Sequence, residues 1–196
     1  MIIKSKCGKY DIQIDNEDYQ KVIGFAPNGW EVRFFTKSNN PYAITRKTID
    51  GKRKQFYLHR LVMNVLNSTT PHIDHKHNDS LDNRKESLRF VSRYQNMANR
   101  TSAKGSSCKH LGVSYCKTKR GTKKYRTSIK DGESHPHNIH LGYYYDEHSG
   151  GYAYNLAAEV IHGEYANLNT ININDVDNPN DIREYVEKVL EKYNFN

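Results

Sequence analysis

Cysteine is scarce in this sequence of 196 residues. Its three cysteines, Cys7, Cys108 and Cys116, form no C-x-x-C pair, which disfavours a paired-knuckle zinc site and predicts free thiols in a reducing compartment. A structural zinc site made by Cys108, Cys116 and His110 stays open as an alternative. The sequence also lacks a recognisable signal peptide and any apolar run long enough to span a bilayer. We therefore expect a soluble, intracellular protein without a membrane partner.

Hydrophobic residues make up 36% of the chain, and the mean hydropathy is −0.92. Any core is therefore modest and divided, in one domain or two small ones. Acidic residues are nearly absent from residues 83–130, which hold fourteen Lys or Arg residues and one acid, Glu86. The last stretch, 131–196, is the reverse, with twelve acidic and three basic residues. The net charge of +8 favours a polyanionic partner, although a basic face that is merely solvated is the alternative.

Residues 72–99 are predicted to form a strand, a loop, a second strand and a helix. The strands fall at 72–75 and 88–91, and the helix at 93–99. Ser92 is the expected N-cap, because its hydroxyl can accept hydrogen bonds from the amides of the first turn.

This stretch concentrates side chains suited to phosphodiester hydrolysis. Asp74 and Asn96 can each give an oxygen ligand to a hard divalent cation. His75 can take a proton from an attacking water near neutral pH, although strand alternation places it opposite Asp74 unless the strand twists. Asn83 is expected to act as a loop clamp whose side-chain amide bonds backbone groups.

The stretch resembles the HNH nuclease motif in the zinc-free form found in homing endonucleases of phages and group I introns. The resemblance covers about residues 57–99. It implies a ββα-metal site in which Asp74 and Asn96 bind Mg²⁺ or Mn²⁺, His75 is the general base and Asn83 has a structural, catalytic-site role. The final position is Asn rather than His, which that subfamily tolerates. A cytoplasmic location, in a bacterial host or a phage-infected cell, is also implied.

Upstream of the motif, the sequence predicts a β-rich module with Trp30 as a core anchor. His59 and Arg60 follow at the start of a predicted helix, 58–66; we favour a structural role for His59 and DNA contact for Arg60. His72 and His77 flank the motif as further possible ligands, but loop surface is the commoner fate of such histidines. The other predicted elements are strands at 1–7, 10–14, 30–36, 42–45 and 54–57 and a helix at 15–25 capped by Asp15 or Asn16.

Downstream, a polar linker precedes three predicted strands, at 113–116, 124–129 and 138–144, and a helix at 150–162. The segment resembles the plant Apetala-type DNA-binding domain and its phage and bacterial relatives. The residues that carry the resemblance are Gly112-Val113, Tyr125-Arg126-Thr127-Ser128-Ile129, His140-Leu141-Gly142-Tyr143, the Ala-rich helix and Ala166-Asn167-Leu168-Asn169.

That family lays its three-stranded sheet in the major groove of DNA. Tyr125 stands where the family usually has Trp, which implies an altered contact. Arg126, on a strand, suits contact with base edges, while loop lysines suit phosphate. The alternative is that Tyr115 and Tyr125 are half-buried sheet residues and the lysines only add solubility. The remaining candidates for DNA contact are Arg84, Arg93, Lys117, Lys119, Arg120, Lys123 and Lys124.

Taken together, the patterns predict an α+β protein: a β-rich module leading into a ββα-metal motif, then a three-stranded antiparallel sheet packed on one helix, and a C-terminal helix. The expected domains are 1–100 (nuclease, motif 57–99), 101–110 (linker), 111–170 (DNA-binding) and 171–196 (acidic tail).

The expected function is site-specific cleavage of double-stranded DNA by a homing endonuclease, with no small-molecule substrate, as a monomer or homodimer. The alternative is a sequence-specific DNA-binding regulator whose nuclease motif is inactive. The terminal helix, at 181–193, is expected to pack on the neighbouring domain or on a second subunit.

Overall fold

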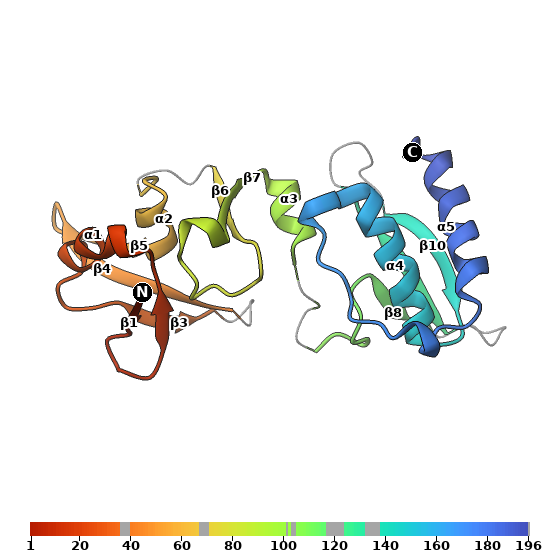
Figure 1. Cartoon of the computed structure of the whole chain (residues 1–196), viewed down its shortest axis with the longest axis horizontal. Coiled ribbons are helices and arrows are strands. Elements are labelled where there is room, and N and C mark those ends of the chain that lie inside the picture. The colour runs from red at the N-terminus through yellow and green to blue at the C-terminus, as the bar shows by residue number, and fades with distance from the viewer. Residues whose placement is uncertain are drawn as a thin grey trace. The chain divides into compact units, whose positions relative to one another are not determined.

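The computed structural model describes residues 1–35, 40–66, 71–100, 102, 105–116, 124–131 and 138–195. They combine helices with antiparallel sheets, which confirms the expected α+β class (Figure 1). The chain divides into two compact units, Met1–Asn96 and Met97–Asn196. The division falls within the helix α3 (Arg93–Ala98), shortly before the linker expected at 101–110.

The N-terminal unit contains a β1–β2 hairpin, a three-stranded sheet in the order β3-β4-β5 and a β6–β7 hairpin, all antiparallel. Its elements are β1 (Ile2–Lys4), β2 (Asp11–Gln13), the 3-10 helix η1 (Asn16–Asp18), α1 (Tyr19–Phe25), β3 (Glu31–Phe34), β4 (Pro41–Ile49), β5 (Lys52–Tyr57), α2 (Leu58–Val62), β6 (His72–His75), the 3-10 helix η2 (Lys85–Ser87) and β7 (Leu88–Val91).

Trp30 anchors the core of this unit, as the sequence predicts. It is 1% exposed, its indole Nε1 donates to the carbonyl of Val22 over 3.2 Å, and its ring stacks on that of Phe25. The helix expected at 15–25 begins at Asn16 with the 3-10 turn η1, which leads directly into α1. The expected capping role of Asp15 is wrong: its carboxylate accepts instead from the backbone amide of Lys85, over 2.8 Å.

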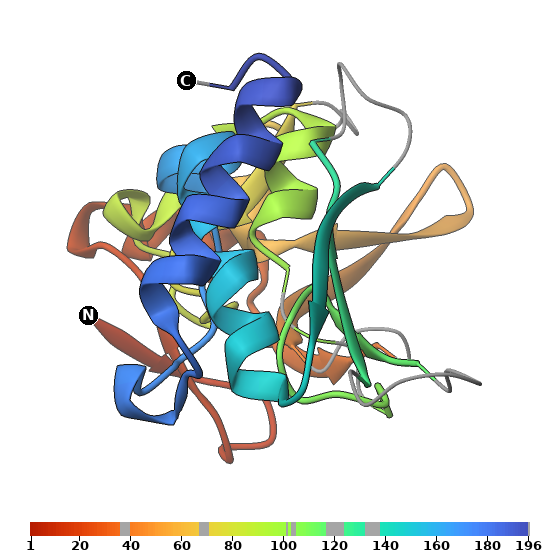
Figure 2. The same cartoon turned by 90° about the vertical axis from the view of Figure 1, so that its right-hand side faces the viewer.

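The C-terminal unit contains an antiparallel sheet in the order β10-β9-β8, so β10 is an edge strand. Figure 2 shows α4 lying against one face of this sheet. The elements are β8 (Val113–Tyr115), β9 (Tyr125–Ile129), β10 (Ile139–Tyr144), α4 (Glu147–His162), the 3-10 helices η3 (Gly163–Tyr165) and η4 (Ile173–Asp175), and α5 (Pro179–Lys192).

Small residues let α4 lie close to the sheet, since Ala153 and Ala157 are fully buried. The helix starts earlier than the predicted 150 because Asp146 caps it, accepting from the amide of Ser149 over 2.8 Å. The acidic helix α5 packs its apolar face into the same core. Within the described part of the chain, no helix combines the length and the apolarity needed to cross a bilayer.

Candidate active site and nucleic-acid interface

The β6–β7 hairpin carries Asp74 and His75 at the end of β6. In its antiparallel register, Asp74 pairs with Arg89 and His75 with Leu88. Asp74 and His75 are each only 7% exposed. Neighbouring residues of a strand point to opposite faces. Burial of both therefore means that both faces of the hairpin are covered at this end.

Arg89 holds the carboxylate of Asp74. Its Nε donates to Oδ2 over 2.9 Å, its Nη2 lies 2.9 Å from the same oxygen, and both side chains are largely buried. A buried carboxylate needs such a charged partner to stay ionised at acceptable cost. A carboxylate offers about four lone-pair directions, so bonding to Arg89 does not by itself exclude a metal ligand role for Asp74. Arg89 is not among the residues predicted from the sequence, although antiparallel pairing of the two predicted strands places it opposite Asp74.

Asn83 connects the loop between β6 and β7 to His75. It is 1% exposed; its Nδ2 donates to the carbonyl of Leu81 over 3.0 Å, and its backbone amide donates to the carbonyl of Gln13 over 2.8 Å. Its side chain also hydrogen-bonds His75, and this bond raises the pKa of the imidazole, against the effect of burial. These bonds are those expected of a loop clamp, and they also orient the imidazole.

Burial dominates the electrostatics of His75 and lowers its pKa below the ordinary histidine value. The negative charge of Asp74, followed by those of neighbouring loop carboxylates, opposes this shift without reversing it. The imidazole is therefore neutral at neutral pH, which is the state that can accept a proton.

Aromatic rings surround His75. The ring of His59 lies edge-on to that of His75, with centroids 5.3 Å apart, and Tyr42 lies 6.1 Å from His75. Tyr57 is 5.5 Å from His59. Burial, followed by the negative charge of Asp74, raises the pKa of Tyr42. Asp74 and His75 thus share one largely enclosed environment, which the sequence did not reveal because Tyr42 and Tyr57 lie on β4 and β5.

The burial of His59 supports the structural role favoured from sequence. Burial, with a smaller effect from His75, lowers the pKa of His59 to about 3. Between pH 6.5 and that value, the unfolded chain binds a proton here that the folded chain does not. Stability must then fall as the pH falls, and a single group of this kind contributes a slope of up to about 1.4 kcal/mol per pH unit.

We therefore expect His59→Gln to flatten the dependence of unfolding free energy on pH between pH 6 and 4. Denaturant titrations followed by Trp30 fluorescence measure it, since this single tryptophan is buried in the same unit. His77→Gln is the matched control, because His77 is exposed and its substitution should leave the slope unchanged. Parallel curves for wild type and His59→Gln would contradict the assignment.

Asn96 lies on the helix α3. The helix begins with a capping box: the amide of Gln95 donates to Ser92 Oγ over 3.2 Å, and the amide of Ser92 donates to Gln95 Oε1 over 2.8 Å. The predicted cap is thus confirmed. Asn96 is exposed and lines a cavity of about 510 Å³ together with His72 and Ile73, the residues that precede Asp74 on β6.

The same cavity is lined by aromatic and polar residues of the central sheet and α2, among them Tyr42, Tyr57, His59 and Arg60. Arg60 reaches it with its guanidinium tied to the protein, since Nε donates to the carbonyl of Val65 over 3.2 Å. The cavity therefore borders the rings of Tyr42 and His59, which contact His75, and it has a positively charged side chain at its wall. Neither Asp74 nor His75 is among its described lining residues.

Two further arginines predicted for DNA contact differ in their availability. Arg84 is bound to carboxylates: its Nη2 lies 2.7 Å from Asp82 and its Nη1 lies 2.6 Å from Glu86. The hydrogen bond from Arg84 lowers the pKa of Asp82 to about 2, and the same bond raises the pKa of Arg84. This geometry favours bracing of the loop over contact with phosphate. Arg93, by contrast, is exposed at the first position of α3.

The downstream sheet turns one face away from α4. Arg126 on this face is exposed, and the register places it between Ser114 of β8 and Tyr143 of β10, which are also exposed. Lys124, just before β9, is exposed as well, whereas Tyr125 is half-buried with its ring edge-on to Tyr115 at 5.8 Å.

Comparison with known proteins gives no relative for either unit. No protein-family model matches the chain, and no curated protein or solved structure does so significantly.

The four other basic residues predicted for phosphate contact lie outside the described residues; they are Lys117, Lys119, Arg120 and Lys123.

Proposed function

We propose that this chain is a DNA endonuclease of the HNH class that hydrolyses phosphodiester bonds at Asp74, His75 and Asn96. The observation that carries the proposal is the buried Asp74–His75 pair, held by Arg89 and Asn83, beside the cavity to which α3 contributes Asn96. An antiparallel hairpin followed directly by a capped helix is also the succession that a ββα-metal motif requires.

The donor set fits a hard divalent cation. Among the described residues, no group of three or more His, Cys, Asp or Glu side chains is gathered for a metal. Asp74 and Asn96 would instead hold Mg²⁺ or Mn²⁺ with one carboxylate and one amide oxygen, leaving the other positions to water and phosphate. Bound there, the cation would supply Lewis-acid activation of the scissile phosphate.

His75 then acts as the general base. Its neutral imidazole takes a proton from the attacking water, and Asn83 keeps the ring oriented while it does so. The resemblance to HNH enzymes implies products with 5′ phosphate and 3′ hydroxyl ends. Incubation of supercoiled plasmid with the protein and Mg²⁺ tests the proposal, because the alternative of an inactive, DNA-binding regulator predicts binding without strand breakage.

Sequence preference should come from the downstream sheet. The exposed row formed by Ser114, Arg126 and Tyr143 offers hydrogen-bonding and aromatic groups on one face. A side chain on a strand can reach a base edge, whereas an exposed lysine before the strand reaches phosphate.

We expect Arg126→Ala to shrink the affinity gap between selected and random duplexes by about 1–3 kcal/mol, the loss for a bidentate base contact. The measurement is a pair of binding titrations across a salt series, with the selected duplex taken from a random pool. Lys124→Ala is the matched control: it should weaken binding to both duplexes alike and reduce the salt dependence. If both variants weakened binding to the two duplexes equally, recognition would lie elsewhere.

A further inference from the structure

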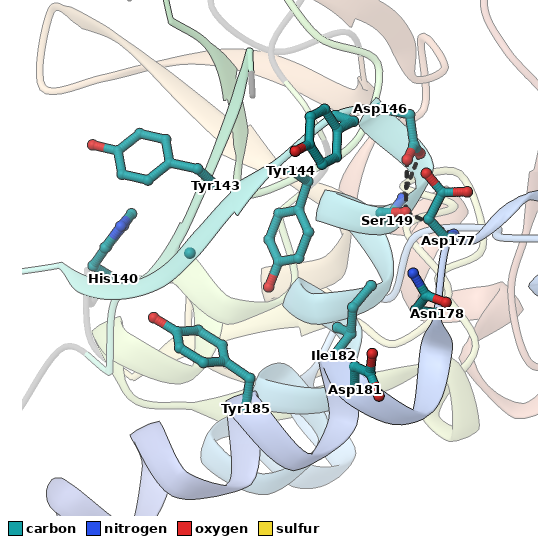
Figure 3. A pocket seen from close by; sticks show the side chains of 12 residues that line it. His140, Tyr143, Tyr144, Asp146, Ser149, Asp177, Asn178, Asp181, Ile182 and Tyr185 are labelled. Atoms are coloured by element: carbon teal, nitrogen blue, oxygen red, sulfur yellow. Dashed lines mark hydrogen bonds between the residues drawn. The ribbon is translucent and has the colours of Figure 1, made fainter. Parts of the chain in front are cut away.

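A second cavity, of about 510 Å³, lies in the C-terminal unit between the edge strand β10 and the helix α5 (Figure 3). It plays no part in the proposed cleavage chemistry. Its lining combines four tyrosines with three aspartates, and no Lys or Arg lines it among the described residues. The lining is therefore negatively charged and would repel DNA, although the chain as a whole has a net charge of +8.

Tyr144 and Tyr185 can both lie close to Gly142 because this residue has no side chain. It sits at an irregularity of the β9–β10 register with φ of 110°, and a Cβ atom there would lie 3.1 Å from Tyr144 Oη and 3.2 Å from Tyr185 Cε1. Tyr144 is fixed by donating its hydroxyl to the carbonyl of Leu141 over 2.6 Å. Tyr185 is half exposed, so its ring is available to a ligand. The irregular register at Gly142 therefore lets the rings of Tyr144 and Tyr185 line one side of the cavity.

The carboxylates lie toward the other end of the cavity from His140 and Tyr143 (Figure 3). Asp146 is fixed there by its bonds to the amide and hydroxyl of Ser149, over 2.8 and 2.7 Å. The same hydroxyl accepts from the amide of Asp177 over 3.0 Å, which ties the two acidic segments together. Asp181, in the first turn of α5, is the third carboxylate, and it is exposed.

This arrangement selects the shape of the ligand. The three carboxylates do not converge on a point where they could share one metal ion, so their complement is an extended molecule with several positive charges. Arg126 acts electrostatically on His140, so the His140 end already has a cation nearby and the ammonium groups belong at the aspartate end. One lysine side chain would leave two of three carboxylates unmatched.

We propose that this cavity binds an aliphatic polyamine, with its ammonium groups at Asp146, Asp177 and Asp181 and its methylene chain against Tyr144 and Tyr185. Carboxylates and aromatic faces are the two groups that attract organic cations, and the apolar rings cover the chain between the charges. Tyr143 lines this cavity and also belongs to the face proposed for DNA contact, so binding is tested with the DNA-free protein.

Isothermal titration of the full-length, DNA-free protein with spermidine tests this proposal. We expect one saturable site, whose affinity falls about fivefold or more in Asp181→Asn, through the lost charge, and in Tyr185→Leu, through the lost aromatic face. Glu187→Gln is the matched control, because it removes the same charge from the exposed side of the same helix, outside the cavity. It should leave the affinity within twofold of wild type, roughly the effect of a screened surface charge.

A lysine-rich peptide provides the second arm, since it presents the same ammonium groups on a protein partner. Tighter binding of the peptide than of spermidine, with the same sensitivity to Asp181→Asn, would overturn the polyamine in favour of a protein ligand. Equal losses in Asp181→Asn and Glu187→Gln, or no saturable site, would overturn the cavity itself. Circular dichroism of each variant confirms that α5 is intact, and Tyr185→Leu keeps the test valid if Asp181→Asn loosens the helix.

Discussion

His75→Ala is expected to lower the rate of DNA cleavage by about 10²-fold or more, the usual loss for a positioned general base. The physical reason is local: His75 is the buried, neutral imidazole beside Asp74, and Asn83 fixes its ring. Affinity for DNA should barely change, because the imidazole acts on water rather than on the duplex. Single-turnover cleavage rates and binding titrations on the same duplex separate these two effects.

The control for this prediction is His77→Ala. His77 lies two residues away but is exposed on the loop, so its removal should leave the cleavage rate within a small factor of wild type. Near-normal cleavage by His75→Ala would assign the base to another residue. A large loss of cleavage rate in His77→Ala alone would assign the general base to His77.

Replacing either proposed metal ligand should abolish cleavage in ordinary Mg²⁺. Asp74→Asn is preferred to Asp74→Ala, because the amide oxygen can still accept from the buried guanidinium of Arg89 and so avoids stranding its charge. Asn96→Ala removes the second oxygen from an exposed helical position at little cost to folding. Excess Mn²⁺ is expected to restore part of the activity of Asn96→Ala, since that variant keeps the carboxylate ligand.

Asn28→Ala serves as the matched control, since it makes the same substitution at an exposed turn of the same unit. It should cleave like wild type. The measurement is cleavage across a metal titration, with thermal unfolding of each variant to show that the fold persists. Wild-type rates in Asp74→Asn at every Mg²⁺ concentration would remove Asp74 from the proposed site.

Local sequence signals were sufficient for most of the elements around the candidate site. The strands expected at 72–75 and 88–91 match β6 and β7, because alternation and flanking turn residues are read within a few positions. Ser92 caps α3 as predicted, since capping depends on residues only three apart. The helix expected at 58–66 ends at Val62, earlier than its apolar residues suggested.

Long-range partners were beyond the sequence. Asp15 has the right chemistry for a helix cap, but it is taken by the amide of Lys85, which no local pattern shows. The sequence predicts DNA contact for Arg84, but its guanidinium is bound to Asp82 and Glu86. The same holds for larger assemblies of side chains, such as the rings around His75 and the cavity beside α5, because their members come from distant strands and helices.

The measurement that most directly tests the central claim is conversion of supercoiled plasmid, with wild type and His75→Ala compared in Mg²⁺ and in EDTA. We predict nicked or linear product only in Mg²⁺, formed about 10²-fold more slowly by His75→Ala than by wild type. Equal activity in EDTA and Mg²⁺, or equal activity of the two proteins, would contradict a metal-dependent nuclease site at Asp74, His75 and Asn96.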